Sequence, residues 1–405
     1  MSEKSDEVIG IQDEEEQDIN EGENWKKLPY LKILSMEYNQ NNTLLVLSTN
    51  YGYRIFDTLN NFKLVSIVDE NQKELGPLKK TKILYKSSLI GFIGARENER
   101  FKENTLNIYS DEYQKILSKI SFNQNIKDFY ISSSLLFVCF ISHIYVFELH
   151  SMKFIHNIPH CLFKDKLFSI TEDPLEENED DEFTFNNKVI TVAYVSSYQN
   201  DIKTQRYIIN KNITNFVVKD EVISDFGECP EMIKLFKGFK MIVRSKSGNK
   251  LHIYDYVNNS LLYCHNLGKG SLIIQDISFG LKNKFILIHY NNYQFDLIKI
   301  KKEFERAQCT CGKNSNRYGY KRLNTYDFGF NKAKIENSYC QGELLKGKGV
   351  NEFCLHFDSK QKEIINIVDN GGNLTVYQFD RKEKGDKLKL VKKVSLFDDD
   401  SKNDF

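Results

Sequence analysis

Residues 89–158 contain short apolar runs separated by polar turns, and this pattern decides the fold. In order the segments read LIGFIG (89–94), ARENERFKEN (95–104), TLNIYS (105–110), DEYQKILSKISF (111–122), NIKDFYI (125–131), SSLLFVCF (133–140), SHIYVFELH (142–150) and MKFIHNI (152–158). Runs of about four to eight residues rich in Ile, Val, Phe and Tyr, bounded by Asn, Ser, Asp and Gly, are typical of antiparallel strands. A helical period is nowhere sustained. The segment is therefore predicted to be all-β.

The same rhythm returns at residues 31–68, 233–264 and 350–396. A four-strand unit that returns about every 40–50 residues is typical of a β-propeller blade, and a chain of 405 residues has room for about seven. We predict an all-β, seven-bladed, WD-repeat-like β-propeller with four antiparallel strands per blade, spanning residues 27–397. Closure requires the terminal strands to share or adjoin a blade. Leu31–Glu37 is therefore expected near Leu388–Leu396.

The composition is that of a soluble globular protein. Hydrophobic residues make up 40% of the chain and aromatic residues 13%, whereas no run approaches the roughly 18 apolar residues that a membrane-spanning helix needs. The amino terminus, MSEKSDEVIG, lacks the basic and apolar regions of a signal peptide. We therefore expect the eight cysteines to stay reduced in the cytosol.

The net charge of zero hides a strong segregation of charge. Residues 1–24, 172–182 and 398–404 carry net charges of −9, −8 and −3, which leaves +20 for the rest of the chain. We predict an acidic disordered tail at 1–26, an acidic inserted loop at 172–186 in the fourth blade, and an acidic tail at 398–405. A basic body suits contact with an anionic surface, and the acidic arms either compete for it or only keep the protein soluble.

Several motifs resemble the PROPPIN family of polyphosphoinositide-binding propellers, which includes the WIPI proteins. They are Asn39–Thr43 with Tyr51–Phe56 in the first blade, Gly94-Ala95-Arg96 with Thr105–Tyr109 in the second, and Met152–Ile158 at the end of the third. The resemblance covers most of the predicted propeller. It implies a lipid headgroup site at blades five and six and a membrane-contacting loop in blade six.

The headgroup site of the family surrounds a Phe/Leu-Arg-Arg-Gly sequence, whose two arginines fork onto different phosphates. The flanking strands align this motif with HNLGKGS at 265–271, which lacks the double arginine. The residues that the resemblance assigns to the site are Ser245, His252, Gly268, Lys269, Gly270 and Ser271. In blade six the same register brings in Asp296, whose charge would repel a phosphate. The segment is either a weakened lipid site or a glycine-rich turn without a ligand.

The long loop of the family corresponds to residues 301–334, which carry nine basic residues against three acidic ones, interleaved with aromatic residues. Basic residues attract anionic headgroups, and aromatic residues favour the membrane interface. The predicted membrane contacts are Lys301, Lys302, Phe304, Arg317, Tyr318, Tyr320, Lys321, Arg322 and Phe328. The same pattern suits single-stranded nucleic acid, and a loop folded back with its aromatic side chains buried is a further alternative.

No motif in the sequence predicts catalysis or a bound metal. Cys309 and Cys311, with Cys340 and Cys354, have a poorer spacing than a zinc ribbon. No nucleophile elbow, zinc-protease helix or paired carboxylates in an apolar context occur. We therefore expect no enzymatic activity, no metal and no cofactor.

The resemblance implies a monomeric scaffold of autophagy or endolysosomal protein transport. Such a protein binds phosphatidylinositol 3-phosphate or the 3,5-bisphosphate and recruits autophagy-type protein partners. It is expected in the cytoplasm and peripherally on autophagic precursor, endosomal or vacuolar membranes, with no nucleic-acid partner. The alternative is a propeller for protein–protein interaction that has lost phosphoinositide binding.

Overall fold

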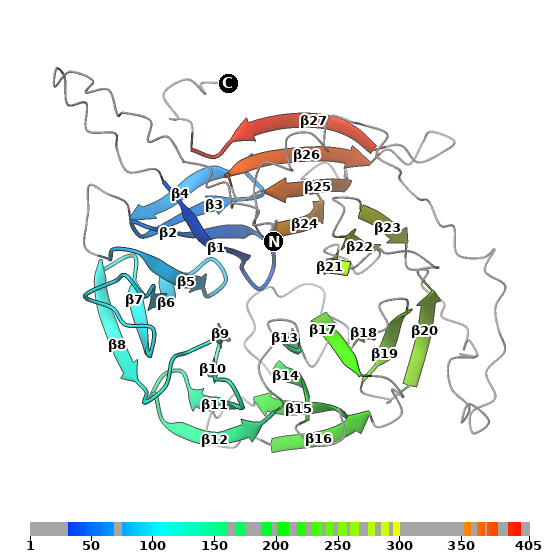
Figure 1. Ribbon diagram of the computed structural model, residues 1–405, viewed down its shortest axis with the longest axis horizontal. Helices are drawn as coiled ribbons and strands as arrows, with labels where there is room; N and C mark the ends of the chain where they lie inside the picture. The colour runs from blue at the N-terminus through cyan, green and yellow to red at the C-terminus, as the bar shows by residue number, and fades with distance from the viewer. Residues whose placement is uncertain are drawn as a thin grey trace, which may run out of the picture. The chain divides into compact units, whose positions relative to one another are not determined.

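The computed structural model is built from strands and turns in all the residues that it describes (Figure 1). These are residues 31–68, 75–160, 167–174, 188–196, 201–209, 217–223, 229–236, 240–245, 250–256, 260–266, 274–279, 285–290, 295–299, 352–357, 363–368, 371–379 and 388–397. The all-β prediction is confirmed. All strands of the described residues lie within the unit Lys32–Phe405.

The strands form seven sheets in chain order, each made of consecutive strands. Sheet 1 contains β1 (Ile33–Tyr38), β2 (Leu44–Thr49), β3 (Tyr53–Asp57) and β4 (Lys63–Val68). Sheet 2 contains β5 (Leu78–Ile83), β6 (Leu89–Gly94), β7 (Thr105–Ser110) and β8 (Lys115–Ser121). Sheet 3 contains β9 (Asp128–Ile131), β10 (Leu135–Cys139), β11 (His143–Glu148) and β12 (Phe154–Pro159). Sheet 4 contains β13 (Phe168–Pro174), β14 (Lys188–Val195), β15 (Ile202–Ile209) and β16 (Val217–Ile223).

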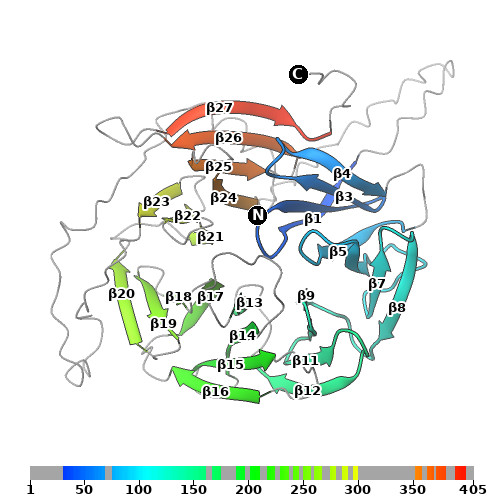
Figure 2. The same cartoon turned by 180° about the vertical axis from the view of Figure 1, so that it is seen from behind.

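Sheet 5 contains β17 (Pro230–Phe236), β18 (Lys240–Ser245), β19 (Lys250–Asp255) and β20 (Ser260–Asn266). Sheet 6 contains β21 (Ile274–Phe279), β22 (Phe285–Tyr290) and β23 (Phe295–Lys299). Sheet 7 contains β24 (Glu352–Phe357), β25 (Glu363–Val368), β26 (Asn373–Phe379) and β27 (Leu388–Ser395). Figure 2 shows the same sheets from behind.

Neighbouring strands within each sheet are antiparallel, which gives every sheet two distinct edges. By the edges of a sheet we mean the two rims at which its strands end, not its outermost strands. At the lower edge the first strand turns into the second, and the third strand ends. At the upper edge the second strand turns into the third, and the chain passes to the next sheet. Contacts between sheets include pairs of first strands, such as β1 with β5 and β13 with β17, so first strands are innermost.

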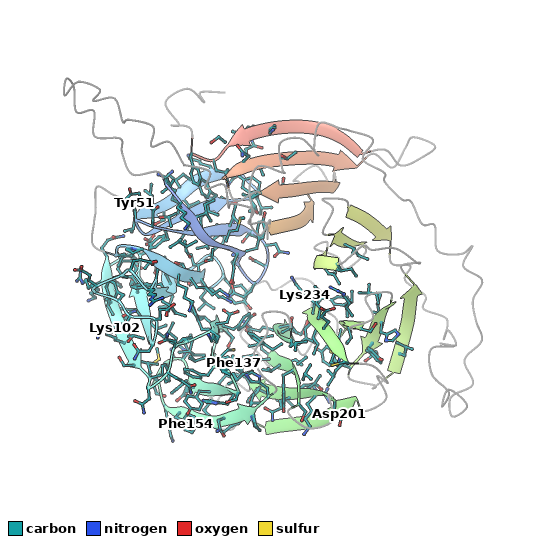
Figure 3. The ribbon with its side chains drawn as sticks, viewed as in Figure 1. Tyr51, Lys102, Phe137, Phe154, Asp201 and Lys234 are labelled. Carbon is teal, nitrogen blue, oxygen red and sulfur yellow. The ribbon has the colours of Figure 1, made fainter. Side chains whose placement is uncertain are left out.

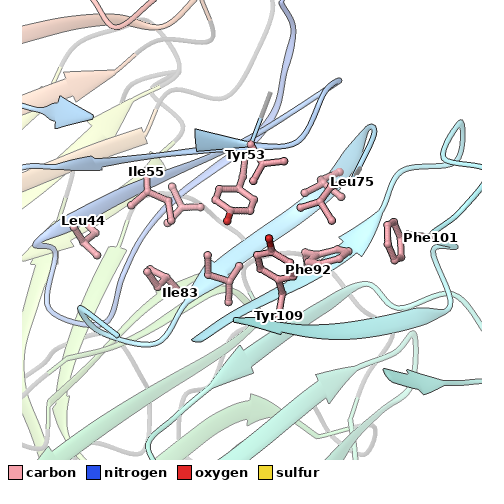
Figure 4. Packing of buried hydrophobic residues seen from close by; sticks show 12 residues of the cluster. Leu44, Tyr53, Ile55, Leu75, Ile83, Phe92, Phe101 and Tyr109 are labelled. Atoms are coloured by element: carbon pink, nitrogen blue, oxygen red, sulfur yellow. The ribbon is translucent and has the colours of Figure 1, made fainter. Parts of the chain in front are cut away.

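Apolar side chains fill the space between successive sheets from sheet 1 to sheet 5. Figure 4 shows the cluster between sheets 1 and 2, in which Tyr53 and Ile55 face Phe92 and Tyr109. Similar clusters join sheets 2 and 3, sheets 3 and 4, and sheets 4 and 5. The second strands β2 and β10 are buried along their whole length because both of their faces are covered. Such strands read as continuous apolar runs instead of alternating ones.

The first and last sheets also pack against each other, as the closure prediction requires. Ile33 and Met36 of β1 share an apolar cluster with Leu374 of β26 and with Leu396, directly after β27. Phe397 extends this contact: the Arg54 guanidinium lies 5.2 Å from its ring centroid. Sheet 1 contains only strands from the start of the chain and sheet 7 only strands from its end. The two sheets are therefore joined by side-chain packing, and neither contributes a strand to the other.

The outer, fourth strands share a backbone irregularity that the sequence did not reveal. In sheets 1, 2, 3, 5 and 7 the register between the third and fourth strands shifts by one residue. The extra residues are all aliphatic: Val65, Leu117, Ile155, Leu262 and Val391. A bulge interrupts the hydrogen-bonding edge of a strand and hinders pairing with another chain.

The strand before the predicted acidic loop of sheet 4 is longer than expected. Strand β13 extends to Pro174, so residues 172–174 of the predicted loop 172–186 belong to the strand. Glu172 explains the difference, because its carboxylate accepts hydrogen bonds from the Ser133 hydroxyl and backbone N–H and lies 3.1 Å from Lys188 Nζ. A carboxylate with these partners is stable in a buried strand end.

A network of four charges joins the innermost strands of sheets 1, 2 and 3. Lys80 Nζ lies 2.9 Å from both Glu37 and Asp128, and Lys82 Nζ lies 2.8 Å from Glu37 and 3.0 Å from Asp128. Their side chains are only 14–25% exposed. Burial alone would raise the pKa of Asp128, but the two ammonium groups lower it to about 2. Removing one partner would leave a buried charge without compensation.

We expect Asp128→Asn to destabilise the protein by about 3 kcal/mol at neutral pH, because two ammonium groups would then share one carboxylate. Since the folded-state pKa is depressed, the contribution of Asp128 is present above its ordinary pKa of about 3.9 and is lost as the pH falls toward 2. Urea unfolding of both proteins from neutral to acidic pH measures this. Exposed Glu97→Gln serves as the control, and equal stability of the Asp128→Asn variant and the native protein at neutral pH would contradict the expectation.

Candidate functional site

The predicted headgroup residues Ser245 and His252 lie on the face of sheet 5 that is turned toward sheet 4. His252 pairs with Val243 across β18 and β19, and Val243 packs in the cluster between sheets 4 and 5. Ser245 shares this face because side chains two residues apart on a strand point the same way. Both residues are buried. They lie near the upper edge of sheet 5, in its interior. Their role in headgroup binding stays a prediction.

Arg244, which the sequence analysis did not single out, points to the opposite face of sheet 5. Its Nη1 donates a hydrogen bond of 2.5 Å to the carbonyl oxygen of Ile274, the first residue of β21 in sheet 6. Its Nη2 lies 2.7 Å from Glu231 Oε2. The arginine is 4% exposed, whereas the Glu231 side chain is 42% exposed. The buried cation at the junction of sheets 5 and 6 is thus paired with a carboxylate that is partly exposed to solvent.

A bulge in the first strand of sheet 5 positions Glu231. The register between β17 and β18 shifts between Pro230 and Met232, so Glu231 is the extra residue. Bulges re-aim a side chain and often lie beside binding sites. The first strand of sheet 2 has the same shift at Lys79, which pairs with Glu103 at 2.9 Å. The first strands of sheets 1 and 6 have this shift as well, at the uncharged residues Leu34 and Gln275, so the bulge is a shared feature of first strands.

The remaining predicted headgroup residues, Gly268, Lys269, Gly270 and Ser271, lie outside the described residues. The strand before them ends at Asn266, which pairs with Lys250 at the upper edge of sheet 5. In sheet 6, Asp296 is the second residue of β23 and also lies near the upper edge, opposite Ile288. Arg244, Asn266 and Asp296 therefore share one edge of sheets 5 and 6.

The predicted membrane contacts between Lys301 and Phe328 also lie outside the described residues. The strand before them, β23, ends at Lys299, which pairs with Phe285 at the start of β22. This pairing places the end of β23 at the lower edge of sheet 6. The turn that resembles the headgroup motif and the basic-aromatic segment therefore leave their sheets at opposite edges.

Sheets 2 and 3 expose large hydrophobic residues on their outer strands. Leu117 of β8 is 49% exposed and Phe154 of β12 is 50% exposed, whereas exposed Tyr113 and Ile141 lie in the turns before β8 and before β11. Figure 3 shows Phe154 on the outer strand β12. Its ring packs 5.5 Å from that of Tyr145 and 5.7 Å from that of Phe147, so the buried side of Phe154 is held in place. Exposed Lys115 and Lys119 on β8 make this surface basic as well as apolar.

No group of three or more metal-binding side chains occurs among the residues that the structure describes. They also contain no helix with the length and apolar character needed to cross a bilayer. Of the cysteines considered for zinc, Cys309, Cys311 and Cys340 lie outside the described residues, and Cys354 is in β24.

Comparison with known proteins gives related sequences. The chain is 22% identical to Autophagy-related protein 18 of Debaryomyces hansenii over 270 residues, which is 62% of this chain and 47% of that protein. It is 19% identical to Autophagy-related protein 18 of Kluyveromyces lactis over 323 residues, 68% of this chain and 63% of that protein. The chain thus spans between about half and two-thirds of these relatives. No protein-family profile matches it.

Solved structures share the fold. Kluyveromyces lactis Hsv2 with its complete loop 6CD superposes with a TM-score of 0.64 at 14% identity, covering 91% of this chain and all of Hsv2. KlAtg21, in a complex with the coiled-coil of AgAtg16, superposes with a TM-score of 0.58 at 15% identity, covering 90% of this chain and 99% of the matched chain. At these identities the likeness concerns the fold.

The architecture is that of a β-propeller, in which each sheet is a blade. The chain is homologous to Autophagy-related protein 18, and the assignment to the PROPPIN family made from its motifs is supported.

Proposed function

We propose that the protein is a peripheral membrane scaffold of autophagy or endolysosomal traffic. It binds membranes that carry phosphatidylinositol 3-phosphate or the 3,5-bisphosphate and recruits partner proteins to them without catalysing a reaction. The observation that carries the proposal is the relationship to Autophagy-related protein 18 over 62% of the chain. The protein would act in the cytoplasm and at autophagic precursor, endosomal or vacuolar membranes.

The proposed membrane contact is the segment 301–334, which follows the last strand of sheet 6. Its nine basic and three acidic residues give it a net charge of +6. Basic residues near an anionic bilayer contribute about 1 kcal/mol each, and the aromatic residues between them favour the interface. The absence of a double arginine at 265–271 shifts the proposed recognition from one headgroup toward general anionic charge.

The proposed partner surface is the apolar and basic outer face of sheets 2 and 3. A related fold, KlAtg21, forms a complex with a coiled-coil of AgAtg16. A helix with an apolar stripe and acidic flanks would complement Leu117 and Phe154 together with the neighbouring Lys115 and Lys119. Exposed apolar residues rimmed by charge are typical of protein-binding surfaces.

The second candidate function is protein–protein interaction alone. Asp296 at the upper edge of sheet 6 and the missing double arginine favour it, because both weaken phosphate binding. Flotation with vesicles that contain or lack phosphatidylinositol 3-phosphate separates the two candidates. A scaffold floats with the phosphoinositide vesicles, whereas an interaction propeller stays at the bottom of the gradient in both cases.

Replacing Lys321 and Arg322 by Glu should weaken vesicle binding by about 2–4 kcal/mol at low salt, and by less at physiological ionic strength, because the local charge reverses. The measurement is flotation with anionic vesicles over a range of salt. Lys392→Glu with Lys393→Glu, an equal charge change on exposed residues of β27, is the matched control. Unchanged binding of the variant with both Lys321 and Arg322 replaced would mean that the segment has a structural role and does not contact the membrane.

Arginine introduced at both Asn266 and Leu267 should strengthen binding to 3-phosphorylated vesicles and make it less sensitive to salt. Two guanidinium groups supply charge-assisted, bidentate hydrogen bonds that Lys269 cannot reproduce. Flotation with phosphatidylinositol 3-phosphate and with charge-matched phosphatidylserine vesicles measures the effect. An equal gain with both lipids would mean that only charge was added. Tight, salt-resistant and isomer-specific binding by the native protein would show that the site is not degenerate.

Phe154→Asp should weaken binding of the AgAtg16 coiled-coil by about 2 kcal/mol, the loss typical of a central aromatic residue in an interface. Titration calorimetry measures the affinity, and the thermal midpoint checks that the variant is folded. Val391→Asp is the control, because Val391 is similarly exposed, at 55%, on the outer strand of sheet 7. Equal affinities of the two variants would show that the proposed surface does not bind the coiled-coil.

A further inference from the structure

The ion pair between Arg244 and Glu231 has the geometry of an anion site that is already occupied. The guanidinium is anchored on one side by the Ile274 carbonyl oxygen, and its other terminal nitrogen meets the Glu231 carboxylate at 2.7 Å. A planar guanidinium matches carboxylate and phosphate in the same way. The position of the Glu231 oxygen is therefore one that a phosphate oxygen would also satisfy.

The arginine retains hydrogen-bonding capacity beyond these two contacts. Arg244 Nε is buried and has no hydrogen-bond partner among the described residues. An unsatisfied buried donor is costly, and a ligand with several acceptor oxygens gains by satisfying it. Burial also lowers the pKa of Arg244 while Glu231 acts in the opposite direction, as expected of a cation that depends on an anion beside it.

Glu231 is suited to leave this position. Its side chain is 42% exposed, so the carboxylate can move into water at little cost in solvation. It is also the bulged residue of β17, and its displacement requires no break in the pairing of Met232 with Arg244. Lys234, three residues after Glu231 on the same strand, is labelled in Figure 3 and marks this part of sheet 5.

We propose that Glu231 is an internal competitor that occupies the phosphate position of Arg244 at the junction of sheets 5 and 6. A phosphate monoester displaces it and takes its place on the guanidinium. The inference rests on the proposed function in that this phosphate belongs to a phosphoinositide headgroup, and a soluble inositol phosphate offers the same chemistry. Arg244 then supplies part of the phosphate recognition that the missing double arginine does not.

The test compares the full-length native protein with Glu231→Gln and Glu103→Gln. Glutamine at 231 keeps an acceptor for Arg244 but removes the competing charge. Glu103 is the matched control, because it pairs with the bulged Lys79 of sheet 2 and its replacement changes the net charge equally. Each protein is titrated with inositol 1,3-bisphosphate and with inorganic phosphate, with the thermal midpoint as readout, and is floated with vesicles that contain or lack phosphatidylinositol 3-phosphate.

Glu231→Gln should bind inositol 1,3-bisphosphate about tenfold more tightly than the native protein, the gain expected from one charge-assisted hydrogen bond. Without ligand its thermal midpoint should fall, and the ligand should restore it. Glu103→Gln should bind as the native protein does. Combining Glu231→Gln with Arg244→Lys should cancel the gain, because a lysine lacks the planar fork. The unliganded thermal midpoint of this double variant shows whether it is folded.

The outcomes separate the inference from the proposed function. A gain with soluble inositol phosphate but no vesicle binding by any protein supports the inference and removes the membrane function. Vesicle binding that is equal in the native protein and Glu231→Gln, with no gain for the soluble ligand, keeps the function and overturns the inference. Equal gains for Glu231→Gln and Glu103→Gln reduce the effect to net charge and overturn the inference, and so does the absence of binding to every ligand.

Discussion

The structure depends on sheets that are buried on both faces. Strand β6 of sheet 2 shows the constraint at single-residue scale: Phe92 packs toward sheet 1, whereas Ile93 packs toward sheet 3. A sheet of this kind is stable only when a neighbour covers each side, so the first and last sheets must also meet. Here that contact is made by side chains, with Phe397 placed against Gly372, which has a φ of +76°, and beneath Arg54. A Cβ at Gly372 would lie 2.2 Å from that ring, so the glycine is needed for the contact.

The same constraint explains which strands could be predicted from the sequence. Strands covered on both faces, such as β6 and β10, appear as the apolar runs LIGFIG and LLFVC and were recognised. Strand β5 reads LKKTKI and was not, because two of its lysines are buried in ion pairs with Glu37 and Asp128 from other sheets. No local pattern marks such pairing. The bulges of the outer strands were also invisible, since a register shift depends on two strands at once.

The candidate site was also only partly predictable from the sequence. The flanking strands placed Ser245 and His252 on sheet 5, but not the direction in which they point. Because neighbouring residues of a strand face opposite sides, Arg244 meets sheet 6 while Ser245 faces sheet 4. A single arginine in the apolar run MIVRS was the available signal for Arg244. Its partner Glu231 could not be inferred, because the contact is created by a bulge in β17.

Two groups of buried charge, the network of sheets 1 to 3 and the pair of Arg244 with Glu231, differ in their capacity to take up an anionic ligand. In the network of sheets 1 to 3 each ammonium group meets two carboxylates and each carboxylate meets two ammonium groups, and all four side chains are mostly buried. An external anion at Lys80 or Lys82 would have to displace a carboxylate that is itself mostly buried. Among the described side chains Arg244 has one carboxylate partner, Glu231, and that side chain is 42% exposed. A phosphate monoester in place of that carboxylate would bring a charge of about −1.5 to −2 to the guanidinium, so it can pair with Arg244 more strongly than a single carboxylate does. The hydrogen bond from Arg244 to the carbonyl oxygen of Ile274 uses the other terminal nitrogen and does not need to break.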